Sequence, residues 1–185
     1  KAVEVHAGAQ DLIAMLPRDA LTKTMVRQAI DALNAVSASL ERLKAEMQAL
    51  AAQLPEYPVV MAMHGVGDSL GPQLMAELGD VTRFTHRNAI TAFAGVDPGA
   101  DQSGTYEAKS TRVSKSGPPE LRRALFLVMD CLLKTMPQDD PVYRFMDKKR
   151  AEGKPYLVYM TAGANKFLRI YYGRVKEHLA QLENS

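Results

Sequence analysis

Cysteine and long apolar runs are scarce in this sequence. Cys131 is the single cysteine among 185 residues, so the chain cannot form an internal disulfide. Its place in the apolar run LFLVMDCLL predicts a buried thiol in a reducing compartment. No apolar run approaches the roughly 18 residues that a membrane span requires, and no positively charged start precedes an apolar signal segment. We therefore expect a cytoplasmic protein without membrane contact.

Residues at metal-binding spacing are also missing. The four histidines, at positions 6, 64, 86 and 178, are scattered along the chain. No cysteine or histidine pair has the spacing of a zinc site. We expect no metal site within these residues.

The residues that are present suffice for a folded core. Apolar residues make up 46% of the chain, enough at this length for one globular domain plus an extension. The net charge is only +2, but residues 144–185 hold nine Lys and Arg against four Asp and Glu. Such clustering fits a polyanionic partner, and equally a solvated helix face. The opening KAVEVHAGAQ, without methionine, suggests a segment excised from a longer protein.

Residues 21–54 predict one long helix that forms a coiled coil. Apolar residues recur with heptad spacing over about four repeats, and neither Gly nor Pro interrupts them. The seam positions are Val26, Ala29, Leu33, Val36, Leu40, Leu43, Met47, Leu50 and Leu54. We expect this helix to pair with one of two partners. The partner is either the same helix of another copy, which gives a homo-dimer or higher oligomer, or a second helix of a longer chain. In the alternative interpretation, the long helix packs on the chain's own domain and forms no coiled coil.

After Pro55 and Pro58, residues 59–79 resemble a helix-hairpin-helix motif. An apolar run ends at HGVG, and Asp68 or Ser69 is placed to cap a second helix. In such motifs glycines such as Gly65 and Gly67 leave backbone N–H groups free for a nucleic-acid phosphate. The same turn also joins helices that bind nothing.

Residues 95–117 form a polar, glycine-rich segment with few large apolar side chains. Ser103 and Gly104 lie in it, and the cations Lys109, Arg112, Lys115, Arg122 and Arg123 follow. A hydroxyl beside a glycine and a run of cations suits phosphate chemistry, because the cations stabilise charge on the phosphoryl oxygens and glycine allows close approach. Ser-Gly is equally common in plain turns. We expect a loop or short β-hairpin carrying Ser103.

Residues 118–182 predict the C-terminal helices. Two prolines suit the first turn of a helix with an apolar stripe, and a last helix begins near Tyr156. Its predicted core face comprises Leu157, Met160, Ala164, Leu168, Tyr171, Val175 and Leu179. Lys166 and Arg169 lie on a different side and are candidate nucleic-acid contacts.

In order, these landmarks are HGVG with LMAELGDVTRF, FAGVDPG, QSG, VSKSGPPELRRAL and DPVYRFMDKKRAEGKPYLVYM. Over residues 57–176 this order resembles insertion-sequence transposases of the IS-one-ten type, also called bridge-RNA-guided serine recombinases. By that resemblance Ser103 matches the nucleophile, which forms a phosphoserine intermediate with DNA. The family implies two nucleic-acid partners, DNA and a structured guide RNA. It also implies prokaryotic cytoplasm, with association to the nucleoid when active.

The resemblance also implies a part that these residues lack. Family members carry a RuvC-like domain with four acidic metal ligands before the coiled coil, which implies a divalent metal such as Mg²⁺ there and no cofactor within this segment. We expect the isolated segment to be inactive.

The sequence therefore predicts a mainly α-helical protein. A lead-in and long helix occupy residues 1–56, and a transposase domain occupies residues 57–185. The alternatives are a non-catalytic helix-hairpin-helix module that binds nucleic acid and dimerises, and a purely structural dimerisation protein.

Overall fold

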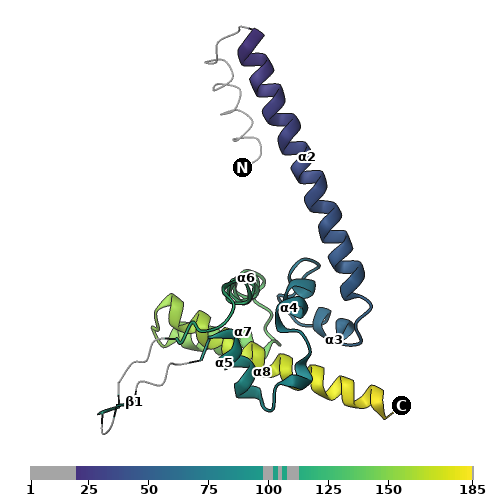
Figure 1. The fold of residues 1–185 in the computed structure, drawn as a ribbon. Helices are drawn as coiled ribbons and strands as arrows, with labels where there is room; N and C mark the ends of the chain where they lie inside the picture. Colours follow the sequence, from purple (N-terminus) through teal and green to yellow (C-terminus); the bar gives the residue numbers. More distant parts are fainter. Residues whose placement is uncertain (1–19, 98–101, 104–105, 108–112, 185) are drawn as a thin grey trace. The chain divides into compact units, whose positions relative to one another are not determined.

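A computed structural model describes residues 20–97, 102–103, 106–107 and 113–184, with side chains at all of these except 20, 102, 103, 106 and 107. This part is mainly α-helical, which confirms the predicted fold class (Figure 1). Contacts divide the chain into Lys1–Ala45 and Glu46–Ser185. The predicted lead-in over residues 1–19 lies outside the described residues.

The long helix α2 spans Ala20–Ala51. It ends three residues before the predicted end at Leu54, because Pro55 has no N–H and disfavours helical backbone at the residue before it. Its apolar seam is exposed: Leu33 is 65% exposed, Val36 67% and Leu43 58%.

Helices α3, Tyr57–Met61, and α4, Leu70–Leu78, flank the HGVG turn. Of the two predicted capping residues, Asp68 and Ser69, Ser69 occupies the N-cap position of α4, but its side chain makes no capping hydrogen bond. The two helices approach closely, since a Cβ added at Gly71 would collide with the Met61 sulfur. Gly79, with φ of 60°, ends α4.

A 3-10 helix, η1, spans Val81–Arg83, and helix α5 spans Arg87–Ala94. Asp80 caps η1 by accepting from the Thr82 N–H at 2.8 Å and from its hydroxyl, and these bonds lower the pKa of the Asp80 carboxyl. His86 caps α5, because its Nδ1 accepts from the N–H groups of Asn88 and Ala89, each at 3.2 Å.

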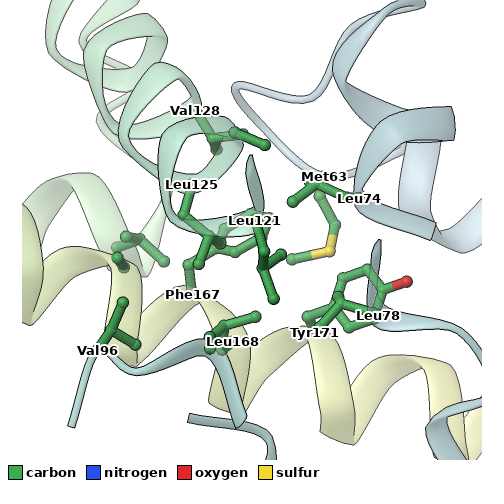
Figure 2. Close-up of a cluster of buried hydrophobic side chains, with 14 of the residues drawn as sticks. Met63, Leu74, Leu78, Val96, Leu121, Leu125, Val128, Phe167, Leu168 and Tyr171 are labelled. Carbon is green, nitrogen blue, oxygen red and sulfur yellow. The ribbon is translucent and has the colours of Figure 1, made fainter. Parts of the chain in front are cut away.

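Helices α6, Pro119–Thr135, α7, Pro141–Ala151, and α8, Tyr156–Glu183, complete the fold. Helix α8 contacts α3, α5, α6, α7 and η1 and is the central element of the core. Figure 2 shows Phe167 and Leu168 of α8 among Leu121, Leu125 and Val96, all of them buried.

The predicted core face of α8 is correct from Met160 to Val175, and Leu179 packs partly against it. Leu157 is a wrong prediction: it is 66% exposed, whereas Met160 is fully buried. The packed face of α8 begins only at Tyr159. Leu157 fits the helical period of the apolar residues, but it lies before the part of α8 that other elements cover. Cys131, predicted to be buried, is only partly buried.

Candidate functional site

Two short antiparallel strands carry the predicted nucleophile. Strand β1 is Gln102–Ser103 and strand β2 is Tyr106–Glu107. Ser103 pairs with Tyr106, and Gln102 pairs with Glu107. Gly104, Lys109 and Arg112 lie outside the described residues, as does the side chain of Ser103.

The segment that carries these strands begins and ends at one structured place, which we call the loop base: residues 95–97 and 113–117. The Ser114 N–H donates to the Asp97 carbonyl and the Lys115 N–H donates to the Gly95 carbonyl, both at 3.2 Å. The Ser114 hydroxyl donates to Asp97 Oδ1 at 2.8 Å and lies 3.2 Å from the Ser116 hydroxyl. Backbone and side chains thus join the two ends.

Glycines allow the two halves of the loop base to touch. Gly95 ends α5 in the left-handed conformation with φ of 64°, and a Cβ there would lie 2.8 Å from the backbone nitrogens of Ser116 and Gly117. A Cβ on Gly117 would collide with the Phe93 carbonyl oxygen. Larger residues would push the two ends apart.

The predicted cations near the loop base have different surroundings. Arg122 donates to the Gly117 carbonyl and ties the first turn of α6 to the loop base. Lys115 is exposed and adopts left-handed backbone with φ of 52°. Arg123 is exposed. Arg122 therefore has a structural contact, whereas Lys115 and Arg123 extend to solvent.

Two of the predicted nucleic-acid contacts, Lys166 and Arg169, lie in the last helix, α8. The Lys166 ammonium is 4.7 Å from the centre of the Phe145 ring of α7, a cation–π contact that fixes this half-buried side chain. Arg169 is exposed. The contacts of Lys166 are therefore with α7, separate from those that hold the loop base.

The two glycines of the HGVG turn also differ. Gly65 has φ of 79°, and a Cβ there would lie 2.9 Å from the Val128 carbonyl oxygen of α6. Gly67 faces open space, with no atom within 4 Å of an added Cβ. The turn is joined to the α6–α7 connection as well, because His64 Nε2 is 3.6 Å from Asp139 Oδ2. Gly65 is thus required for packing, and Gly67 leaves room for a ligand.

Asp97, Ser114 and His86 were not among the predicted site residues. Asp97 and Ser114 are 17 positions apart, so no local pattern relates them. His86 caps the helix that leads to the loop base, and its position just before a helical segment was the available signal.

Among the described residues, no group of three or more His, Cys, Asp or Glu could hold a metal ion. In the same part of the chain, no helix is both long and apolar enough to cross a membrane.

Comparison with known proteins gives consistent matches. The model of the transposase IS116/IS110/IS902 family matches residues 57–144. The chain is similar to the insertion element IS110 uncharacterized 43.6 kDa protein of Streptomyces coelicolor, at 25% identity over 174 residues, 94% of this chain and 42% of that protein. Pilin gene-inverting proteins of Moraxella bovis and Moraxella lacunata are each 27% identical over 114 residues, 62% of this chain and 35% of each relative.

These matches confirm the resemblance to IS110-type transposases that the motifs predicted. The chain spans less than half the length of these curated relatives.

Proposed function

We propose that this chain, whose residues 57–144 match the IS116/IS110/IS902 transposase family, is the part of a DNA transposase or recombinase that handles and cuts DNA. The single observation that carries this is the matched range, which includes both the HGVG turn and the Ser103 strand. The similarity to an insertion-element protein and to gene-inverting proteins supports the same class of reaction.

In our proposal Ser103 is the nucleophile. Its Oγ attacks a DNA phosphorus, a serine-phosphate ester bond forms, and one bond from that phosphorus to a deoxyribose oxygen breaks. The departing sugar oxygen takes up a proton, and the serine proton passes to a base. Without an activating base a serine hydroxyl is a poor nucleophile.

We further propose that the HGVG turn and nearby cations hold nucleic acid. The N–H groups at the start of α4, beside Gly65 and Gly67, suit a backbone phosphate. The open space at Gly67 supports this. The exposed cations Lys115, Arg123 and Arg169 would neutralise phosphate charge. Arg122 and the residues predicted from the sequence, Gly104, Lys109 and Arg112, would contribute to the same contact with nucleic acid.

We propose that the activity of the whole protein involves components beyond the residues of this chain. We propose that a RuvC-like domain, with divalent metal such as Mg²⁺, and a structured guide RNA complete the activity. The resemblance and the share of the relatives that this chain covers support this proposal. Nucleoid association would follow from DNA binding.

We propose that α2 pairs with α2 of another copy. Its exposed heptad seam supports this, because apolar side chains at 50% to 67% exposure, among them Leu33, Leu40 and Leu50, lose their contact with water when two such helices associate.

The nucleophile is tested with the protein at the full length of its relatives, the guide RNA and labelled DNA. A covalent protein–DNA adduct that survives denaturation should form with the native protein and be absent with Ser103→Ala, while DNA affinity is retained. Ser110→Ala, a serine of the same loop, is the matched control and should still form the adduct. An adduct that persists in Ser103→Ala would disprove the assignment.

The second candidate is a non-catalytic helix-hairpin-helix module that binds nucleic acid and dimerises. The packed α3–α4 pair and the open Gly67 favour it. Salt-dependent DNA binding without any adduct from the full-length protein would select this function.

A further inference from the structure

Helix α8 contains an exposed glycine that packing within the chain does not require. Gly173 lies well inside this helix, and no atom lies within 4 Å of a Cβ added there. Gly163 of the same helix differs, because its added Cβ would collide with the Met146 sulfur. Glycine disfavours a helix interior. A glycine at an open, exposed helix position therefore suggests that another molecule approaches the helix backbone closely.

Three cations lie on the same side of α8 as this glycine. Arg169 is four positions before Gly173, Lys176 is three positions after it, and Lys166 is seven positions before it. At these spacings the four residues lie within an arc of about 80° and extend over about 15 Å of the helix axis. We call them the α8 outer surface. Glu177 is the acid nearest to it in sequence, so the surface is positively charged.

Aromatic side chains, and not carboxylates, hold the two lysines of this surface. The Lys176 ammonium donates to the Tyr172 hydroxyl at 3.0 Å, and that hydroxyl donates to the Phe84 carbonyl at 3.1 Å. The Lys166 ammonium lies over the Phe145 ring. Among the described residues, none of the three cations forms an ion pair. The lysines are thus held in place while their charge stays available to an anion.

We propose that the α8 outer surface binds the sugar–phosphate backbone of a nucleic-acid duplex, and that Gly173 lets the strand approach the helix between Arg169 and Lys176. This rests on the nucleic-acid binding in the proposed function and is independent of the Ser103 chemistry. Binding of single strands relies on aromatic rings that stack on bases, whereas the rings next to this surface, of Phe145 and Tyr172, are engaged by lysines. Backbone contacts carry no sequence information, so this surface should bind duplexes of any sequence.

Gly173→Leu tests the close approach. The substitution keeps the charge of the surface and fills the space above the helix backbone, so affinity for a labelled duplex should fall by about fivefold or more. Ala38→Leu, at an exposed position of α2 outside its seam, is the matched control and should bind like the native chain. Fluorescence anisotropy with the whole chain measures both. An affinity of Gly173→Leu that equals that of the control would overturn the proposal.

Gly173→Ala separates a glycine required for binding from one required for folding. Alanine favours the helix and meets no neighbouring atom, so the midpoint of thermal unfolding should rise by about 2 to 4 °C. Gly163→Ala is the contrast and should lower the midpoint, because its methyl group is overpacked against Met146. A lower midpoint for Gly173→Ala would show that this glycine serves the fold, which contradicts the proposal.

Arg169→Gln and Lys176→Gln test the charge of the surface. Each should weaken duplex binding and reduce the slope of log affinity against log salt by about one. Lys134→Gln removes an exposed cation of α6 and controls for net charge, so its slope should stay close to that of the native chain. Slopes of Arg169→Gln and Lys176→Gln that match this control would exclude the α8 outer surface as a phosphate contact.

Three probes identify the ligand: a DNA duplex, an RNA hairpin and a single-stranded DNA of unrelated sequences. A loss of affinity with the DNA duplex or with the RNA hairpin supports the proposal and shows which duplex lies on α8, whereas an equal loss with the single strand overturns it. A native chain that binds none of the probes would overturn the proposed nucleic-acid binding as a whole. Native binding that the α8 substitutions leave unchanged would overturn this inference alone.

Discussion

Gly65 lies against the Val128 carbonyl of α6, so closely that an added Cβ would be 2.9 Å from that oxygen. The same glycine has a backbone φ of 79°, a conformation that residues with a Cβ rarely adopt. The HGVG turn thus packs on α6 at a position that leaves no room for a Cβ, and its two glycines have separable roles.

Gly65→Ala should lower the free energy of unfolding by about 2 kcal/mol, because the new methyl group is overpacked against Val128 and Leu132. Gly67→Ala is the matched control: no atom lies within 4 Å of its added Cβ, so its stability should stay within about 0.5 kcal/mol. Urea denaturation followed by circular dichroism measures both. If a phosphate approaches Gly67, Gly67→Ala should weaken DNA binding without this loss of stability. If the two variants were equally stable, the close contact between Gly65 and α6 would not contribute to the free energy of unfolding.

His86→Ala should destabilise the protein by about 1 kcal/mol, since two N–H groups at the start of α5 lose their acceptor. His86→Asn supplies another capping oxygen and should retain most of the stability. Thermal unfolding compares the three proteins. A His86→Ala protein as stable as the native one would mean that water replaces the cap at no cost.

Association through α2 should depend on its seam. Leu33→Asp with Leu40→Asp places charge in the predicted interface, so sedimentation at micromolar concentration should show monomer where the native chain is a dimer or larger. Ala38→Asp with Ala45→Asp adds the same charge on the opposite face of α2 and should leave association unchanged. A native chain that sediments as a monomer would exclude self-pairing by α2.

Arg122 and Arg123 are neighbours in sequence with different expected effects. Arg122→Ala removes the donor to the Gly117 carbonyl and should lower stability. Arg123 is exposed, so Arg123→Ala should leave stability unchanged, weaken DNA binding and reduce the slope of log affinity against log salt by about one. Fluorescence anisotropy over a salt series, with thermal unfolding, checks both. A salt slope unchanged in Arg123→Ala would remove this residue from the proposed phosphate contacts.

The sequence by itself determined the helical fold class, the long helix with its seam, the break at Pro55 and most of the buried face of α8. These features follow from local causes: the period of apolar residues, the missing N–H of proline and the conformational freedom of glycine. The nature of the Ser103 segment as a polar excursion between helices was also evident from composition.

Only the tertiary structure decided where distant residues meet. It placed Gly65 against Val128, exposed Leu157 despite its helical period, and brought the Ser114 hydroxyl to Asp97. Such contacts depend on how complete helices dock, and docking is decided by the summed fit of many side chains on several elements. A periodic pattern within one segment carries no information about it.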